Sequence, residues 1–332
     1  MSSSPALLVD RFGRQINYVR LSVTDRCDLR CLYCMNQRPR FLPRAQLLTL
    51  EELARLGRCF TALGVTRLRV TGGEPLVRRN VLWLLAQLGA IPGIDLSLTT
   101  NGMRLVQLAD SIAAAGVKRL NISLDTLHPA RFRTITRSGD LQQVLDGIAA
   151  AQAAGFVRIK LNSVLINGIN QQEAPALVAF AIDQGVDIRF IEEMPLGQQI
   201  NTPAPRFYPS AAILNDLTRD FVLHPDHSAA DGGPARYWQI AGTKTRVGII
   251  APQSDNFCAQ CNRVRVTAAG QLLFCLGHSQ SMDLRRLLRA YPSDDQRVQR
   301  AIRTAICHKP QGHQFLHPEI ASLERTMNAT GG

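Results

Sequence analysis

The sequence between Asn17 and Met194 alternates short strand-like runs with helical segments, and this alternation restricts the fold to the α/β class. Each run is rich in aliphatic and β-branched residues, which favour strands. Successive parallel strands need a crossover connection, and the intervening helices supply it. Six units of this kind predict a parallel sheet, with strands at Tyr18–Val23, Arg67–Thr71, Ile94–Thr99, Arg119–Leu124, Val157–Leu165 and Asp187–Ile191.

The helical segments have recognisable first and last residues. Thr49 and Glu52 have the spacing of a capping box, in which each side chain binds the main chain of the other residue. Gly64 follows as a stop signal, because glycine accepts the left-handed conformation that ends many helices. Similar signals predict helices over Asp140–Gly155 and Asn170–Gly185, and the second of these again opens with a capping-box spacing.

Polar residues follow the carboxyl ends of four predicted strands. In a parallel barrel these ends share one face, on which active sites are built, whereas an open sheet would spread them along a crevice. Both architectures satisfy the strand and helix pattern, but a shared face favours a partial (β/α)6 barrel of the TIM type. The segments concerned are Thr71–Pro75, Thr99–Gly102, Ser123–Asp125 and Glu192–Met194.

The alternation stops after Met194, and the rest of the chain predicts a smaller α+β extension. Segments 195–209 and 224–236 are rich in turn-forming residues and predict loops. We therefore expect two domains, residues 1–194 and 195–332. The extension is expected to contain hairpin strands in Tyr237–Ile250 and Val264–Phe274 and helices near Met282–Ala290 and Asp294–Cys307.

The chain is strongly basic, since 38 Lys and Arg residues against 26 Asp and Glu give a net charge of +12. Almost all of the basic residues are arginines, whose planar, charged forks suit phosphate and carboxylate groups. This charge favours an anionic ligand, either a nucleotide or a nucleic acid, but an aromatic content of 6% offers little for base stacking. No apolar stretch is long enough to span a membrane, and residues 1–9 lack the layout of a signal peptide, so we expect a cytoplasmic protein with no membrane partner.

Three of the eight cysteines lie close together near the N-terminus. Cys27, Cys31 and Cys34 have the spacing C-x3-C-x2-C on the loop after the first predicted strand. Three thiolates can hold one face of a [4Fe–4S] cubane and leave its fourth iron open to another ligand. A structural zinc is the alternative, but it needs a fourth donor, and the first histidine of the chain is His128. The spacing therefore favours an iron–sulfur cluster.

A second triplet near the C-terminus consists of Cys258, Cys261 and Cys275. Zinc is a stronger alternative here, because His278 could complete a set of four donors. The spacing alone leaves zinc and iron–sulfur open. Arg263 and Arg265, two positions apart, project from the same face of a predicted strand beside these cysteines. A site that binds a polyanion beside an open iron needs such arginines and a structural zinc does not, so the neighbourhood favours a second cluster.

The first triplet and a second motif together resemble the radical S-adenosylmethionine enzymes. The features that carry the resemblance are the cysteine spacing, a tyrosine directly before the third cysteine, and Gly72–Pro75 after the second predicted strand. The resemblance implies a six-unit partial barrel and a cluster whose open iron chelates the methionine part of S-adenosylmethionine (SAM). An electron from that cluster then cleaves the sulfonium to a 5′-deoxyadenosyl radical. The implied SAM contacts are Tyr33, Gly73, Ser123 and Met194.

Within that superfamily, nearly the whole chain resembles the GTP 3′,8-cyclases of molybdenum cofactor biosynthesis, from Arg20–Cys27 to the terminal Gly331 and Gly332. The resemblance implies a second [4Fe–4S] cluster on the C-terminal cysteines, whose open iron binds the guanine of GTP. It also implies that the Gly-Gly tail reaches the active site, whereas the residues alone would predict a flexible end. The implied GTP contacts are Arg20, Arg69, Thr100, Lys160, Arg263 and Arg265.

In this family the radical takes hydrogen from C3′ of GTP, and C3′ then bonds to C8 of guanine. The implied product is (8S)-3′,8-cyclo-7,8-dihydroguanosine 5′-triphosphate, and no catalytic side chain beyond the cluster ligands is implied. The implied partners are a reductant such as flavodoxin or ferredoxin, cyclic pyranopterin monophosphate synthase as the next enzyme, and a second copy in a homodimer. Asp28 stands where the family usually has asparagine, Leu29 where it has an aromatic residue, and Thr330 where it has an aliphatic one.

Two other functions are compatible with parts of the pattern. A radical enzyme that modifies peptides often carries extra C-terminal clusters, but such extensions usually hold more cysteines and have no evident use for Arg263 and Arg265. A basic zinc protein that binds nucleic acid should line its basic residues along a helix or groove with stacking aromatics. Here the arginines lie at predicted strand ends beside cysteines, so we expect a nucleotide and no nucleic acid as the anionic ligand.

Overall fold

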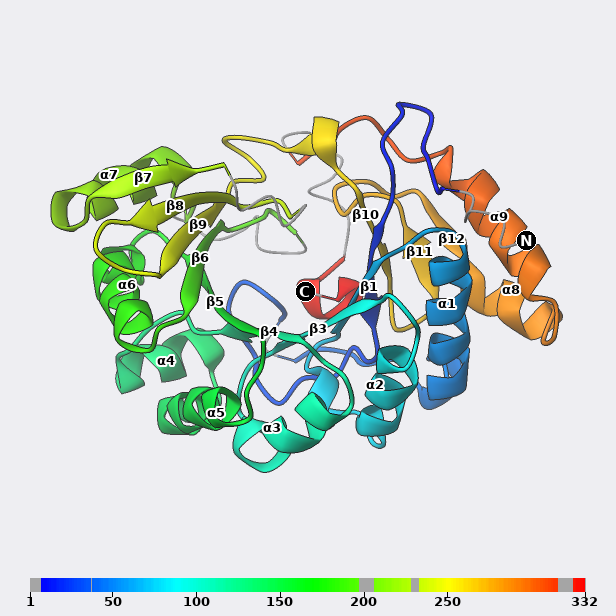
Figure 1. Cartoon of the computed structure of the whole chain (residues 1–332), viewed down its shortest axis with the longest axis horizontal. Coiled ribbons are helices and arrows are strands. Elements are labelled where there is room, and N and C mark those ends of the chain that lie inside the picture. The colour runs from blue at the N-terminus through cyan, green and yellow to red at the C-terminus, as the bar shows by residue number, and fades with distance from the viewer. Residues whose placement is uncertain (1–6, 37, 197–205, 228–232, 316–324, 332) are drawn as a thin grey trace.

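The computed structural model describes residues 7–36, 38–196, 206–227, 233–315 and 325–331. Strands and helices alternate along the N-terminal part, and all six predicted strands are present (Figure 1). The strands are β1 (Tyr18–Ser22), β2 (Arg67–Thr71), β3 (Asp95–Thr100), β4 (Arg119–Ser123), β5 (Arg158–Leu165) and β6 (Asp187–Glu192). The helices between them are α1 (Leu50–Ala62), α2 (Val81–Gly89), α3 (Leu105–Ala114), α4 (Pro129–Thr136), α5 (Leu141–Ala153) and α6 (Ala174–Asp183).

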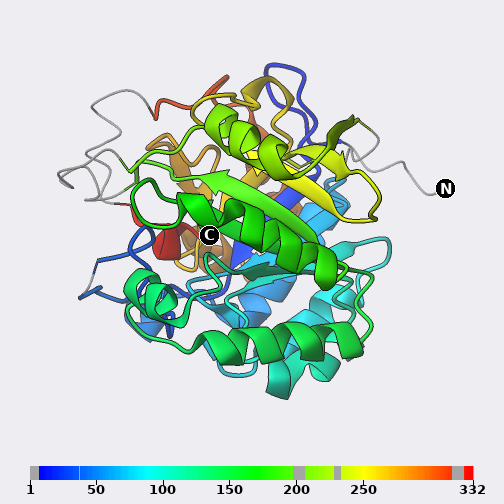
Figure 2. The same ribbon diagram turned by 90° about the vertical axis from the view of Figure 1, so that its left-hand side faces the viewer.

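The six parallel strands stand side by side in chain order and form the wall of an open barrel. Helices α1 to α6 cover its outer face (Figures 1 and 2). The sheet does not close on itself, because it ends at β12 (Ser281–Asp283) on one side and at β7 (Leu223–Asp226) on the other. The predicted partial (β/α)6 barrel is confirmed.

The C-terminal strands extend this sheet at both edges instead of forming a sheet of their own. β10 (Arg263–Val266) pairs in parallel with β1, and β11 (Gln271–Leu273) folds back on β10. At the other edge, β9 (Arg246–Ile250) pairs in parallel with β6, and β8 (Arg236–Ile240) folds back on β9. Both predicted hairpins are therefore present, and they lie at opposite edges of the barrel wall.

The prediction of a loop over residues 224–236 is wrong for its first residues. These first residues belong to β7, which pairs antiparallel with β8 as the last strand of the sheet. Pro225 lacks a main-chain N–H, but an edge strand tolerates proline because one of its sides has no neighbouring strand. Residues 228–232 of the predicted loop lie outside the described residues.

Two of the three capping predictions hold. Helix α1 begins with a complete capping box, in which the N–H of Glu52 donates to Thr49 Oγ1 (3.1 Å) and the N–H of Thr49 donates to the Glu52 carboxylate (2.7 Å). Asp140 caps α5. The capping box expected at Asn170 and Glu173 is wrong, because both side chains are buried and bind the loop after β4 instead.

The apolar core lies between the sheet and the surrounding helices. In β1, Val19 and Leu21 are fully buried in this layer. The alternate positions carry Tyr18 and Arg20, which face the inside of the barrel and line cavities there. Aliphatic side chains fill the inside of a closed TIM barrel. Here the inside is polar and charged, and it leaves room for a ligand.

Helices of the C-terminal part complete the outer layer. Helix α7 (Ser210–Asp220) packs beside α6, and α8 (Leu284–Ala290) and α9 (Asp295–Ile306) lie beside α1 (Figure 1). An ion pair between Arg55 and Asp295 (2.6 Å) joins α1 to α9. Among the described residues, no helix has the length and apolar character needed to cross a membrane.

The last described residues fold back inside the barrel. Met327–Thr330 forms a short helix, α11, within the curve of the sheet (Figures 1 and 2). Asn328 and Thr330 are buried there. The residues alone predict a flexible end, and this is wrong for Met327 to Gly331, because that segment has specific partners described below. Gly332 lies outside the described residues.

Candidate active site

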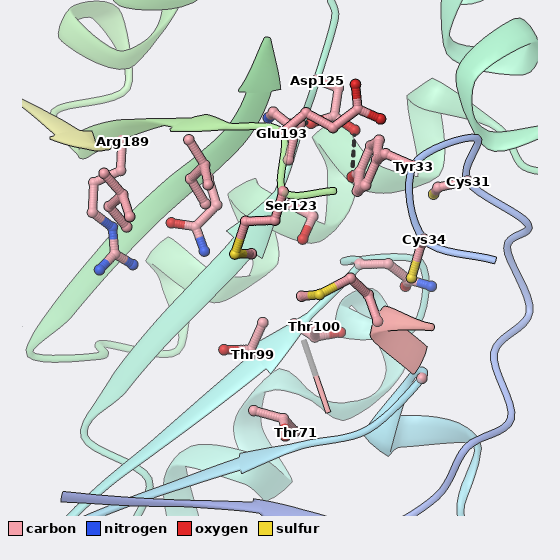
Figure 3. Close-up of a pocket in the computed structure, with 18 of the residues that line it drawn as sticks. Cys31, Tyr33, Cys34, Thr71, Thr99, Thr100, Ser123, Asp125, Arg189 and Glu193 are labelled. Carbon is pink, nitrogen blue, oxygen red and sulfur yellow. Dashed lines mark hydrogen bonds between the residues drawn. The ribbon is translucent and has the colours of Figure 1, made fainter. Parts of the chain in front are cut away.

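One cavity lies within the barrel at the carboxyl ends of the parallel strands, the face on which an active site is expected. The loop after β1 and the ends of β2 to β6 contribute to its wall (Figure 3). Strand β10 contributes Arg263 and Arg265. It therefore brings together residues predicted for two different ligands. They are Cys27, Cys31, Tyr33, Cys34, Gly73, Ser123 and Met194 from the SAM set, and Arg20, Arg69, Thr100, Arg263 and Arg265 from the GTP set.

The loop with the first cysteine triplet is held in place by main-chain hydrogen bonds. The N–H groups of Arg30 and Leu32 donate to carbonyl oxygens at the end of α4, both at 2.9 Å. The N–H of Leu29 donates to Cys27 Sγ at 3.3 Å. Three thiols therefore reach the cavity from one short and well-anchored loop.

Burial and nearby carboxylates act on these thiols in the same direction. Burial, together with Glu74 and Asp28, raises the pKa of Cys27 to about 12. Burial, with Asp125 nearby, raises the pKa of Cys34 to about 12 as well. Cysteines bind metal as thiolates, and a metal ion supplies the positive charge that favours this form in a buried site. The chemistry of these donors therefore fits a metal centre.

Tyr33 is fixed by a buried carboxylate. Its hydroxyl group donates to Asp125 Oδ2 at 2.7 Å, and Asp125 Oδ1 accepts the N–H of Val164 at 2.8 Å (Figure 3). Burial raises the pKa of Asp125 to about 6. Asp125 therefore ties the cysteine loop to β4 and β5 and sets the position of the Tyr33 ring at the cavity wall.

The glycine-rich turn after β2 packs directly against the segment that leads into the cysteine loop. A Cβ atom on Gly73 would lie 2.4 Å from the carbonyl oxygen of Arg26 and 2.7 Å from that of Asp25. Main-chain atoms cannot yield to such an overlap, so the close approach requires glycine. Gly73 therefore helps to place Cys27, the next residue after this segment, at the cavity wall.

Glu74 of the same turn organises the end of β3. Its carboxylate accepts hydrogen bonds from Thr100 Oγ1 (2.9 Å) and from the N–H of Asn101 (2.7 Å). Burial raises the pKa of Glu74 to about 7. Thr100, a predicted GTP contact, is thus held at the wall by a residue that was not among the predicted site residues.

Inward-facing arginines form a row across three neighbouring strands. The register places Arg20 of β1 between Arg265 of β10 and Arg69 of β2. Burial and the neighbouring arginines lower the pKa of Arg69 to about 9 and the pKa of Arg265 well below its ordinary value. In the described part of the chain, neither Arg69, Arg263 nor Arg265 pairs with a carboxylate. Buried cations of this kind are costly, and an anionic ligand would relieve the cost.

Tyr18 lies among these arginines and was not predicted as a site residue. Its ring is 5.4 Å from the Arg69 guanidinium carbon and 5.9 Å from that of Arg263. Burial raises the pKa of Tyr18, but the charges of Arg69, Arg20 and Arg263 outweigh this effect and lower the pKa to about 8. An aromatic residue in a strand usually indicates core packing, so the sequence held no signal for this position.

Lys160 lies in a narrower cavity deeper in the barrel. It is buried, and its Nζ donates to the hydroxyl group of Tyr237 at 2.7 Å. Arg69 and Arg189 line both cavities, so the positive charge continues from one to the other. Arg189 was missed by the sequence analysis, although a charged residue in the middle of the apolar run of β6 was an available signal.

The second triplet does not itself line the main cavity, but its neighbours Phe257 and Arg263 do. The thiol of Cys275 interacts electrostatically with both other thiols of the triplet, which shows that the three are gathered. Burial raises the pKa of Cys261, but the charges of Lys309 and Arg263 outweigh this effect and lower it overall. The triplet thus lies beside cations at one edge of the arginine row.

The geometry of the donors does not match a zinc site. His278, the candidate fourth ligand, has its Nε2 2.9 Å from the carbonyl oxygen of Gly312. Within the described ranges, no group of three His, Cys, Asp or Glu side chains could hold a single metal ion. Tetrahedral zinc needs donors that converge on one ion, whereas a cubane takes one thiolate per iron.

The C-terminal turn α11 contacts both parts of the site. The N–H of Met327 donates to the carbonyl oxygen of Cys34 (3.1 Å), and Arg265 donates to the carbonyl oxygen of Gly331 (2.7 Å). Gly331 has φ of +79°, and a Cβ atom there would lie 2.7 Å from Ser22 Cβ. Only glycine meets both conditions without strain. Gly331 therefore lies directly beside a predicted GTP contact.

Two family models together match most of the chain. Residues 21–181 match the Radical SAM superfamily, and residues 186–315 match Molybdenum Cofactor Synthesis C. Among solved structures, Streptococcus suis SuiB is similar with a TM-score of 0.64 at 14% identity, over 97% of this chain and 79% of SuiB. This structural likeness is one of fold and agrees with the open barrel described above.

Relatives of known name match over nearly their full length. The GTP 3′,8-cyclase of Ectopseudomonas mendocina is 52% identical over 326 residues, which cover 98% of each chain. The GTP 3′,8-cyclase 1 of Pseudomonas aeruginosa is 52% identical over 98% of this chain and 99% of that one. Identity at this level over both parts of the structure shows that the chain belongs to the GTP 3′,8-cyclase family of radical SAM enzymes.

Proposed function

We propose that this protein is a radical SAM enzyme that converts GTP into (8S)-3′,8-cyclo-7,8-dihydroguanosine 5′-triphosphate, the first step of molybdenum cofactor biosynthesis. The observation that carries the proposal is the shared cavity, which the first cysteine triplet and the arginines of β1, β2 and β10 line together. A reactive radical must meet its substrate at short range and in a fixed orientation. One enclosure that holds a radical source and an anion-binding wall meets that requirement.

Residues of the barrel would hold the first cluster and SAM. The thiolates of Cys27, Cys31 and Cys34 would be the cluster ligands, and when bound the cluster and SAM supply a 5′-deoxyadenosyl radical. The chain orients these groups through the Tyr33–Asp125 hydrogen bond and the packing of the glycine-rich turn. The residues that would contact SAM are Tyr33, Gly73, Ser123 and Met194.

The arginine row would hold the nucleotide. Guanidinium groups bind phosphate oxygens in pairs of parallel hydrogen bonds, so a triphosphate would neutralise several of the buried cations at once. Cys258, Cys261 and Cys275 would hold a second [4Fe–4S] cluster, whose open iron would face the guanine base. The residues that would contact GTP are Arg20, Arg69, Thr100, Arg263 and Arg265 in the main cavity, with Lys160 and Arg189 below.

We assign the two expected domains to two tasks. Residues 1–194 would generate the radical and supply part of the nucleotide wall, and residues 195–332 would add Arg263, Arg265 and the second cysteine triplet. The pairing of β10 with β1 supports this shared nucleotide site, because it builds Arg263 and Arg265 directly into the barrel wall. The tail residues Gly331 and Gly332 would help to close the cavity, which excludes water from a radical reaction.

We also propose the surroundings in which the enzyme works. Reductive cleavage of SAM needs a one-electron donor, which we assign to a protein such as flavodoxin or ferredoxin. The product would pass to cyclic pyranopterin monophosphate synthase. A homodimer, a cytoplasmic location and the absence of nucleic-acid or membrane partners are part of the same proposal.

Anaerobic reconstitution with iron and sulfide tests the metal assignment. We expect about eight iron atoms per chain, falling to about four in Cys258→Ala and in Cys31→Ala. Cys307→Ala is the matched control, because Cys307 is exposed at the end of α9 and belongs to neither triplet. Tightly bound zinc at the C-terminal triplet would contradict the second cluster.

GTP labelled with deuterium at C3′ tests the reaction. With SAM and a strong reductant, we expect the label to appear in 5′-deoxyadenosine and an isomer of GTP to form. Cleavage of SAM that leaves the label entirely in GTP would contradict the proposed hydrogen abstraction. The two measurements are independent, so a wrong metal assignment and a wrong reaction give different results.

A further inference from the structure

We infer that Lys309 is a positioning residue for the C-terminal metal centre. Its buried ammonium group hydrogen-bonds two main-chain carbonyl groups and so holds together the chain segments that carry two of the three cysteines. The inference rests on the proposed function, because it takes the second triplet to hold an iron–sulfur cluster. The cysteine spacing does not point to Lys309, which lies in the turn after α9 and far along the chain from the triplet.

Two protons of the Lys309 ammonium group have main-chain acceptors. The side chain is buried, with 2% of the residue exposed. Its Nζ donates to the carbonyl oxygens of Phe274 (2.7 Å) and Arg263 (3.1 Å). Its positive charge also acts on the thiols of Cys261 and Cys275. The ammonium group therefore uses two of its three donors on carbonyl groups beside the cysteines.

These acceptors lie at the open end of the β10–β11 hairpin, one at the start of β10 and the other directly after β11. Phe274 directly precedes Cys275, and Arg263 begins β10 two positions after Cys261. Lys309 therefore pins the main chain next to one metal ligand on each side of the hairpin. The same contact fixes the main chain of Arg263, whose side chain lines the cavity.

The charge of Lys309 has no carboxylate partner in the described part of the chain. A buried cation without a negative neighbour is costly. Neutral thiols would not offset this cost, but a metal-bound thiolate would, since it carries negative charge. The position of Lys309 is therefore that of a cation which balances a ligated cysteine.

This position has an electronic consequence. A positive charge near the ligand sulfurs favours the reduced state of a cluster, which carries more negative charge, and so raises its reduction potential. A lysine that only filled space at the end of α9 would not have this effect. Its replacement would lower the stability of the fold and leave the potential unchanged.

The experiment measures the C-terminal centre alone, in a Cys31→Ala background in which the first cluster cannot assemble. Lys309→Gln and Lys309→Arg are compared with Lys244→Gln, an exposed lysine in the turn between β8 and β9. Iron content is counted after anaerobic reconstitution, and the potential is followed by electron paramagnetic resonance during a redox titration. We expect the glutamine variant to keep its iron but lose about three- to tenfold in its ratio of reduced to oxidised cluster, about 30–60 mV for one electron.

The outcomes test the role of Lys309 and the presence of the second cluster separately. We expect Lys309→Arg, which keeps the charge, to stay close to the parent potential. A glutamine variant that keeps its iron at an unchanged potential overturns the role of Lys309. If that variant does not fold, a large shift in the arginine variant overturns it instead. A parent protein with zinc or no iron at this triplet overturns the second cluster itself, whatever the Lys309 variants do.

Discussion

The two cysteine triplets offer the same number of sulfur donors in opposite electrostatic surroundings. At the first, burial raises the pKa of the thiols, and the nearby carboxylates of Glu74, Asp28 and Asp125 act in the same direction. At the second, Lys309 and Arg263 oppose the effect of burial on the Cys261 thiol and outweigh it. One region gathers buried acids around its sulfur atoms, and the other gathers buried bases.

This difference matches the two tasks proposed for the regions. Negative surroundings disfavour the addition of an electron to a cluster, so a centre at the first triplet would be a strong reductant, as cleavage of SAM requires. Positive surroundings at the second triplet favour anionic ligands and continue into the arginine row. Charges that come from distant parts of the chain thus distinguish two sites with similar cysteine patterns.

The largest loss of activity is expected from a change in the C-terminal tail, which contacts both the first cysteine loop and the arginine row. In Gly331→Ala, the new side chain meets a positive φ and overlaps Ser22 and Thr71, which we expect to displace the tail and reduce product formation roughly 100-fold. Thr330→Ala is the control, because among the described residues its hydroxyl group bonds only within α11 and to Thr326. Full turnover in Gly331→Ala would show that the tail does not contribute to the site.

The second-largest effect tests whether the arginines proposed to bind GTP act independently of the cysteine loop proposed to generate the radical. We expect Arg265→Ala to weaken GTP binding about 10- to 100-fold, because it removes charge-assisted hydrogen bonds to the ligand. Uncoupled cleavage of SAM by an added reductant should continue. Isothermal titration and 5′-deoxyadenosine release measure the two quantities, with the exposed Arg236→Ala as the control. Equal loss of both would contradict the separation of tasks.

A pH effect should appear within the arginine row. The pKa of Tyr18 in the folded protein is about 8, below its ordinary value, so the phenolate is favoured by folding. Its contribution to stability is therefore absent below pH 8 and grows as the pH rises from about 8 towards 10. The phenolate would compete with the nucleotide for the arginines, so GTP affinity should fall several-fold over the same range.

Tyr18→Phe tests this explanation directly. The variant lacks the titrating hydroxyl group, and its GTP affinity should decline less than the parent's between about pH 7.5 and 8.5, below the pKa of Arg69, which is about 9. GTP affinity is measured by titration at each pH, and thermal unfolding shows whether the gain in stability with rising pH has also disappeared. The same decline in both proteins would assign the titration to another group.

The smallest effect is expected from a change to one of the carboxylates beside the first cysteine triplet. Asp28 lies beside Cys27 and pairs with Arg104 (3.2 Å). Asp28→Asn should raise the potential of the first cluster by about 10–30 mV, because it removes a partly exposed negative charge. Arg104→Gln should shift the potential the other way, and shifts of the same sign would contradict the electrostatic explanation.

Local sequence patterns were enough to predict most of the fold and part of the candidate site. Alternation of strand and helix predicts a parallel α/β sheet, and the polar residues after four strands, Gly72–Pro75 among them, favour the barrel with its active face. The i, i+2 spacing of Arg263 and Arg265 predicts that both face the same way, and both line the cavity. These inferences hold because helices and strands have short, fixed periods.

Other residues could not be found in this way because their partners are distant in the chain. Glu74 binds the end of β3, and Lys309 reaches back to β10 and β11 from beyond α9. At Asn170 and Glu173 the local spacing is misleading, because both side chains bind the loop after β4 in place of their own helix. Local spacing cannot indicate which distant group a side chain meets.

The sequence by itself determined the α/β class, the two sets of sulfur donors and the arginine-rich strands, since each is a matter of residue type and short-range spacing. Only the tertiary structure decided that β10 would pair with β1, that α11 would lie inside the barrel, and which charges would surround each triplet. The physical reason is that the strength of an electrostatic interaction depends on distance and burial, and both are set by chain packing.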